Sequence, residues 1–231
     1  AFEAECVREG DLSVDAAPII VAVRLGRATA GQVPVGCAFV DATVRAIRVC
    51  EFDDDEHLST LESMLCQQGA RECLLPAELA DADAARLRDV LELCEVPSTV
   101  AKKSAFVAKD ADDDLRRLLG VRELHNRALG STSQLAVSAT CGLIKYLDLM
   151  ASKETHGLWT LDWVDAAQFM RLDAGAMRAL SVEPIPGESD RNSSLLGLLS
   201  VCKTKVGGRL VRKWLKQPLL SKNDLEQRYD L

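Results

Sequence analysis

Two acidic residues of this chain raise the question of metal-dependent chemistry. Two-metal hydrolysis of a phosphodiester needs several carboxylates grouped around ions that lie roughly 3.5–4 Å apart. In a sheet protein they would come from the first strand, the first helix and the fourth strand. Glu62 falls in the first predicted helix and Glu72 opens the fourth predicted strand. The first predicted strand, Ile19 to Leu25, contains no acid, so a metal-dependent nuclease is an alternative that the sequence disfavours.

Other catalytic patterns are also missing from the sequence. There is no GxxxxGK[ST] loop to hold the phosphates of ATP and no GxSxG turn to present a serine nucleophile. The GGR at 207–209 is not a phosphate loop, because it follows a predicted helix and lacks the Lys-Ser/Thr pair. His57, His125 and His156 are isolated from one another in the sequence. We therefore predict no catalytic, cofactor-binding or metal-binding residues in this chain.

The eight cysteines show neither a metal-binding nor a disulfide pattern. No two form a CxxC pair, and no histidine lies at metal-ligand spacing from any of them. We expect reduced, mostly buried thiols that pack as small hydrophobic side chains, which implies an intracellular compartment. The cysteines are Cys6, Cys37, Cys50, Cys66, Cys73, Cys94, Cys141 and Cys202.

Size and composition are those of a soluble globular protein. The 231 residues are 48% hydrophobic, enough for one well-buried domain and part of another. No apolar run approaches the ~18–20 residues of a membrane-spanning helix. The N-terminal AFEAECVREGD has no secretory signal pattern, and the absence of an initiator Met suggests an incomplete chain.

Charge is distributed unevenly along the chain. The net charge of −7 argues against a dedicated nucleic-acid-binding surface. From residue 191 onward, however, nine Lys/Arg stand against three Asp/Glu, giving +6 there and −13 in the preceding residues. The basic stretch is either a solvated helix face or a surface near DNA phosphates or an acidic neighbouring domain.

Hydrophobic patterns predict an α/β domain in the first part of the chain. Three strand-length apolar runs joined by short connections imply an antiparallel meander. Two further strands then alternate with three helices, which gives the order βββαβαβα of a ribonuclease-H-like domain. The expected strands are 18–25, 34–41, 44–52, 72–75 and 98–101, and the expected helices contain Leu58–Gln68, Leu87–Cys94 and Asp110–Leu119.

Several signals mark the boundaries of these and later elements. The acidic run Asp53–Glu56 precedes the first helix, where each acid would gain roughly 0.3–1 kcal/mol from the helix dipole, and Gly69 ends that helix. A long helix is expected over 131–150, followed by extended segments at 159–165 and 169–172. The proline- and glycine-containing stretch 183–192 is the best linker in the chain.

Residues 193–220 predict two helices joined by a tight turn. Ser193 or Ser194 is placed to cap the first helix, which is rich in leucine. We expect Gly207 and Gly208 to allow close helix approach or a positive φ in the turn, and Pro218 to end the second helix. The apolar face of that helix contains Val206, Leu210, Val211, Trp214 and Leu215, with Lys203, Lys205, Arg209, Arg212, Lys213 and Lys216 between them.

This stretch resembles the opening of the lever (core) region of the MutS family of DNA mismatch-repair ATPases, with its Gly-x-Arg-Leu and Trp-Leu-x-x-Pro-Leu runs. FMRLD at 169–173, followed by Ala179-Leu180, resembles an upstream family segment. Four more segments resemble the eukaryotic MutS homologue 2 branch: VCEFD at 49–53, ECLLP at 72–76, KKSAF at 102–106 and IKYL at 144–147. The family-motif residues are Leu172, Asp173, Lys203, Gly208, Arg209, Leu210, Trp214, Leu215, Pro218 and Leu219.

The resemblance implies a domain plan. Residues 1–17 would be a remnant leading in from the N-terminal mismatch-facing domain, 18–180 the connector, and 181–231 a linker and the first, truncated helices of the lever. The clamp and the ATPase domain would be missing. The family's Phe-x-Glu wedge is not found, since Phe2 is followed by Glu3 and Ala4.

The resemblance also implies a role. In the full-length protein this part would be a non-catalytic scaffold that links mismatched-DNA binding to the ATPase and docks repair proteins. The full-length protein would use ATP and Mg, pair with a sister MutS-homologue subunit, engage mismatched duplex DNA and a MutL homologue, and act in the nucleus, away from membranes. The alternative is a stand-alone interaction module derived from a MutS connector. Because the face with Leu210 and Trp214 normally packs on further lever helices, we expect an exposed apolar patch or a frayed helix after Asn192.

Overall fold

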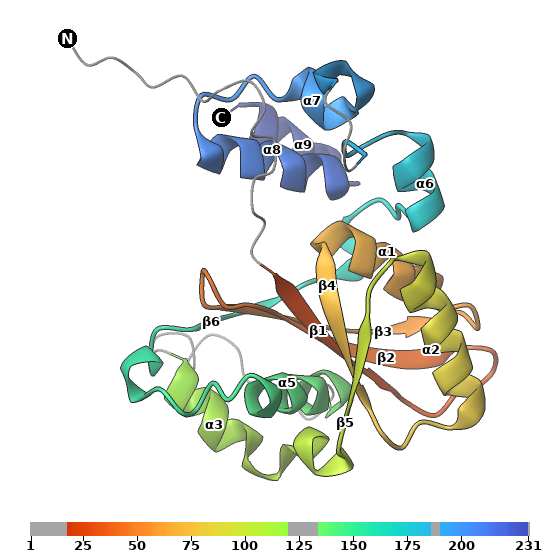
Figure 1. Cartoon of the computed structure of the whole chain (residues 1–231), viewed down its shortest axis with the longest axis vertical. Helices are drawn as coiled ribbons and strands as arrows, with labels where there is room; N and C mark the ends of the chain where they lie inside the picture. The colour runs from red at the N-terminus through yellow and green to blue at the C-terminus, as the bar shows by residue number, and fades with distance from the viewer. Residues whose placement is uncertain (1–17, 120–133, 186–189, 231) are drawn as a thin grey trace. The chain divides into compact units, whose positions relative to one another are not determined.

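The computed structural model describes residues 18–119, 134–185 and 190–230 (Figure 1). These residues form two compact units, one made mainly of 18–166 and the other mainly of 167–230, and each is described by itself. The predicted lead-in segment 1–17, Cys6, His125 and the expected start of the long helix at Ser131 lie outside the described residues.

The first unit is built on a mixed six-stranded sheet in the order β5-β4-β1-β2-β3-β6 (Figure 1). β2 is antiparallel to β1 and β3, which confirms the predicted meander. β4 pairs parallel with β1, β5 with β4, and β6 with β3. The strands are β1 (Ile19–Leu25), β2 (Val33–Asp41), β3 (Ala46–Asp54), β4 (Ala70–Pro76), β5 (Ser98–Ala101) and β6 (Thr160–Trp163).

Helices α1 (Ser59–Gln68) and α2 (Asp81–Leu93) cover one face of this sheet. Two acids of the run before α1, Asp54 and Asp55, accept hydrogen bonds from main-chain amides at the start of the helix. Asp54 belongs to β3, and its carboxylate accepts from the amides of Thr60 at 3.0 Å and Leu61 at 2.8 Å. These bonds satisfy amides at the helix start that have no partner inside the helix. Gly69, with φ of 72°, ends α1 as predicted.

The opposite face is covered by α5 (Gln134–Tyr146), with α3 (Ala111–Leu118) and the short 3-10 helix η1 (Lys103–Phe106) beside it. The predicted long helix is shorter than expected. It ends at Tyr146 and gives way to a turn in which Asp148 has a φ of 48°. The apolar stripe that suggested a longer helix therefore continues into non-helical residues that still pack on the same core.

Four of the seven described cysteines are buried, as the sequence predicted. Cys37 and Cys50 face each other across β2 and β3. Burial and the neighbouring Glu72 raise the pKa of the Cys73 thiol, so this thiol stays protonated near neutral pH. Cys202, in contrast, is exposed.

The second unit is formed by short helices. They are α6 (Ala174–Ala179), α7 (Leu195–Leu199), α8 (Lys205–Lys216) and α9 (Lys222–Tyr229), with η4 (Ala166–Gln168) and η5 (Arg191–Ser193). Of the two alternatives for Gly207 and Gly208, a turn with positive φ was wrong, since neither residue has a positive φ. Both lie inside α8, because the Thr204 hydroxyl accepts from the Gly207 amide at 3.1 Å and begins the helix there. The expected cap at Ser194 is confirmed on α7.

Two glycines give a matched test of these packing assignments. A Cβ at Gly36 of β2 would lie 2.3 Å from the Leu135 carbonyl carbon of α5, whereas a Cβ at Gly208 of α8 would meet nothing within 4 Å. We predict that Gly36→Ala lowers the free energy of unfolding by at least ~1–3 kcal/mol through overpacking. Gly208→Ala should raise it by about 0.5–1 kcal/mol, because alanine loses less backbone entropy in a helix. Urea denaturation followed by circular dichroism would measure both, and equal effects would contradict the two placements.

Candidate functional site

The two family-motif segments of the second unit pair with each other through the main chain. The Met170 amide donates to the Pro218 carbonyl at 2.8 Å, and the Leu220 amide donates to the Gln168 carbonyl at 3.1 Å. Phe169 and Leu219 form the antiparallel bridge between these bonds. The expected extended segment 169–172 is therefore a single bridge, and it joins segments about fifty residues apart in the sequence.

Motif residues next to this bridge contribute to its packing and to the helix that follows. Leu172 and Leu219 are both buried. The Asp173 carboxylate caps α6 by accepting from the Ala176 amide at 2.6 Å, and Pro218 supplies the carbonyl of the bridge. Leu172 and Leu219 pack in the interior of the unit, whereas Asp173 is exposed and holds the start of α6.

Four other motif residues lie in α8 or just before it, and none of them is buried: Lys203, Gly208, Arg209 and Leu210. Lys203 is exposed in the turn before α8, and Arg209 is exposed on the helix itself. Val206 and Leu210 are 71% and 45% exposed, although α8 is fully formed. Of the apolar face expected to be exposed after Asn192, Val206 and Leu210 are exposed, whereas Trp214 and Leu215 are half-buried.

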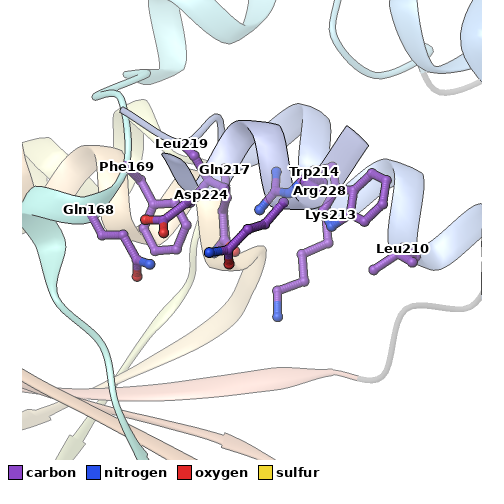
Figure 2. Close-up of a pocket in the computed structure, with 10 residues that line it drawn as sticks. Gln168, Phe169, Leu210, Lys213, Trp214, Gln217, Leu219, Asp224 and Arg228 are labelled. Carbon is purple, nitrogen blue, oxygen red and sulfur yellow. The ribbon is translucent and has the colours of Figure 1, made fainter. Parts of the chain in front are cut away.

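A shallow cavity of about 370 Å³ lies between α8, α9 and the bridge segment (Figure 2). The Arg228 guanidinium lies over the Trp214 ring, 4.9 Å from its centroid, and this stacking closes one wall. Lys213 and Asp224 also line it, with Phe169 on the far side. The lining contains amide, apolar and singly charged groups.

Glu183 is the functional candidate that the sequence did not reveal. Its carboxylate accepts from Arg212 and from Lys216, the latter at 3.3 Å, and all three side chains are largely buried. Burial alone would raise the pKa of Glu183, but the charges and hydrogen bonds of Lys216 and Arg212 hold it below its ordinary value. The available signal was the spacing of the two cations, one helical turn apart, which lets them share one acid.

In the first unit, the segments that suggested the resemblance converge on α5. Tyr146 Oη donates to Glu72 Oε1 at 2.6 Å, which joins the IKYL and ECLLP segments. Lys145 Nζ donates to the Ser104 carbonyl at 3.1 Å, in the KKSAF segment. Glu51, in the VCEFD segment, accepts from the Ala136 amide at 3.0 Å. These polar contacts hold α5 on the sheet.

The two acids of the nuclease alternative do not come together. Leu74, two residues after Glu72 on β4, packs in the core that contains α5, so Glu72 lies on that face and bonds Tyr146. Glu62 is on α1, which packs against the opposite face. Among the described residues, no group of three His, Cys, Asp or Glu side chains is arranged to hold a metal ion. In the same residues, no helix has both the length and the apolar character needed to cross a bilayer.

Two domain models of one protein family match this chain. The model of MutS domain II matches residues 18–158, and that of MutS domain III matches residues 175–231. The chain belongs to the MutS family.

Its relatives include eukaryotic MSH2 proteins, which confirms the resemblance to that branch. The DNA mismatch repair protein msh-2 of Neurospora crassa is 37% identical over 223 residues, covering 94% of this chain and 24% of the relative. MSH2 of Arabidopsis thaliana is 38% identical over 203 residues, covering 87% and 22%, and MSH2 of Saccharomyces cerevisiae is 31% identical over 244 residues, covering 96% and 25%. The chain spans about a quarter of the length of these relatives.

The exposure of Trp214 predicts a small cost for its removal. Trp214 is only partly buried beside Arg228, whereas Leu219 is 8% exposed. We expect Trp214→Ala to cost well below the ~3–5 kcal/mol of a buried aromatic truncation, and Leu219→Ala to cost about 2–5 kcal/mol. Chemical denaturation of both variants would measure this, and a larger loss for Trp214→Ala would contradict the placement of α8.

The Glu183 cluster predicts a pH-dependent stability. Because the folded-state pKa of Glu183 is lowered, its stabilisation is complete above the ordinary value of 4.5 and is lost as the pH falls through the folded-state pKa. Glu183→Gln should cost about 1–3 kcal/mol at pH 7, and the gap from the parent chain should shrink below pH 4.5.

A matched control is Glu226→Gln, which removes the exposed pair with Lys222 and should cost less than about 0.5 kcal/mol. Urea titrations between pH 7 and pH 3 would measure both differences. A gap that stays constant over this range would show that Glu183 stabilises the unit by some means other than its charge.

Proposed function

We propose that this chain supplies the connector and the opening of the lever in a MutS homologue 2-type mismatch-repair protein, and that it acts as a non-catalytic scaffold. Residues 18–180 would be the connector, 181–231 the linker and first lever helices, and 1–17 the segment leading in. The observation that carries this proposal is that models of MutS domains II and III match in series along one chain.

The sheet supports a ribonuclease-H-like connector. Strands β3, β2, β1, β4 and β5 stand in that order, with β2 as the antiparallel member. This arrangement follows from a meander extended on one side by parallel strands and crossover helices. Glu62 and Glu72, the two acids of the nuclease alternative, lie on opposite faces of this sheet, and the proposed role of the fold is that of a support.

The contacts of the second unit support a mechanical role. The Ser181 and Val182 carbonyls accept from the Leu195 and Leu196 amides at 2.8 and 3.1 Å. Glu183, which follows directly, is bound to α8. The incoming segment and the lever helices are therefore tied at several points, and a displacement of one would be passed to the other.

In the whole protein, we infer, this scaffold links mismatched-DNA binding to an ATPase that uses ATP and Mg. The protein would pair with a sister MutS-homologue subunit, recruit a MutL homologue and act in the nucleus. These inferences rest on family membership and on the mismatch-repair names of relatives such as MSH2 of Zea mays.

A chimera tests the proposal. The segment of Saccharomyces cerevisiae MSH2 that aligns with this chain would be replaced by residues 1–231, in a strain lacking its own copy. We expect a mutation rate at least tenfold below that of the deletion strain, with a chimera carrying a flexible Gly/Ser linker as the inactive control. A null rate at normal protein abundance would contradict the scaffold role, as would ATP hydrolysis by the purified 231-residue chain.

A further inference from the structure

β5 forms one edge of the sheet (Figure 1). Because it has a neighbouring strand on one side only, half of its main-chain groups face away from β4. The carbonyls of Pro97 and Ala101 accept from β4-side amides at 2.9 Å each. Because inward and outward groups alternate along a strand, Thr99 also faces β4. The amide and carbonyl groups of Ser98 and Val100 point outward, and no hydrogen bond from a described residue reaches them.

The opposite edge of the sheet is partly covered. Trp159, just before β6, forms a parallel bridge with Leu119, and its amide donates to the Leu118 carbonyl at 3.2 Å. Natural proteins usually protect sheet edges by covering, charging or interrupting them. Within β5 itself, the sequence STVA contains no charge and no proline, whereas Pro97 and Lys102 flank its four residues. The outward groups of Ser98 and Val100 lie between these flanking residues.

Exposed side chains flank this edge on both faces of the sheet. Val100 pairs with Leu75, on the face covered by α1 and α2, and is 65% exposed. Tyr146 reaches the other face from α5 and is 40% exposed. Tyr146 Oη and Thr99 Oγ1 both donate to Glu72 Oε1 at 2.6 Å, which fixes the ring beside β5. A strand added here would find an apolar surface for alternate side chains on each face.

Lysine side chains give the C-terminal end of this edge a positive charge. Lys102 and Lys103 follow β5 directly and are exposed, with Lys103 also contacting Glu78. Lys145 lies close by, since it donates to the Ser104 carbonyl. These lysines belong to a part of the chain whose net charge is strongly negative, so the positive surface is local.

We propose that the β5 edge, defined as Ser98–Ala101 with Tyr146, Lys102 and Lys103, binds an extended segment of a protein partner by strand addition. The segment carries aliphatic or aromatic residues at alternate positions and acidic residues at the end beside the two lysines. Main-chain pairing gives affinity, and the flanking side chains and charges give selectivity. The proposal deepens the partner-docking part of the proposed function by naming a face and the chemistry of its partner.

Peptide binding to the purified 231-residue chain tests the proposal. The probes are fluorescein-labelled octapeptides of alternating Val and Thr with two Asp residues at the N-terminal or C-terminal end, measured by fluorescence anisotropy. We expect one of the two to bind, and the versions with Lys in place of Asp to bind at least fivefold more weakly. Absence of binding at millimolar peptide, or equal binding of the lysine versions, would overturn the proposal.

Variants of the edge make the test specific. Val100→Pro removes the outward amide, and proline is tolerated in edge strands at that kind of position. It should weaken binding at least tenfold, whereas Val44→Ala, at an exposed valine of the β2–β3 turn, should not change it. Lys102→Glu should weaken binding at least threefold. Unchanged binding to Val100→Pro would overturn the proposal.

Two further measurements distinguish loss of strand pairing from misfolding of the variant, and binding of a partner from self-association. A peptide N-methylated at alternate residues cannot pair along its backbone and should bind at least tenfold more weakly, even if Val100→Pro fails to fold. Sedimentation would detect a second copy on this edge: a dimer abolished by Val100→Pro would overturn the assignment to a different protein. Failure of the yeast chimera with intact peptide binding would reject the repair role alone, and the reverse result would reject this docking surface alone.

Discussion

The close approach of α5 to the central strands is the constraint on which the first unit depends. Gly36 permits it, because any side chain there would overlap the backbone of Leu135. At this distance Glu51 can accept from the α5 amide of Ala136, and Ser138 can donate to the Phe106 carbonyl at 2.6 Å. One backbone contact thus brings together the sheet, α5 and η1, and it places Tyr146 against Glu72 beside the β5 edge.

The second unit is held in a different way. Its elements are short, and its described helix α8 has no fully buried residue. Main-chain pairing between the 169 and 219 segments and the shared carboxylate of Glu183 fix the path of the chain. Exposed aliphatic side chains such as Val206 remain on the surface of this unit. The unit therefore combines a chain path fixed at several points with apolar side chains left in contact with solvent.

The sequence was informative where the determining interactions are local. Alternating apolar runs located the strands, Gly69 ended α1, and Ser194 capped α7. Interactions between distant segments were not predictable in this way. Glu183 meets Arg212 across 29 positions, and Tyr146 meets Glu72 across 74, so neither contact has a short-range pattern.

The glycines also show that contacts between distant segments cannot be predicted from local sequence. The pair Gly207-Gly208 suggested a turn, but the cap at Thr204 decides where α8 begins. Gly36, by contrast, lies unremarked in a strand, although its missing side chain allows α5 to pack. The candidate site was predictable to the same extent. Its motif residues could be named from the sequence, but the bridge that joins Phe169 to Leu219 could be seen only in the structure.

Amide hydrogen exchange on the purified chain tests the central claim, that the first unit is rigid and the second unit has a lower stability. The account predicts strong protection in the strands between Ile19 and Leu75, where the buried core and α5 oppose opening, and weak protection after Asn192. Equal protection throughout the chain would contradict it.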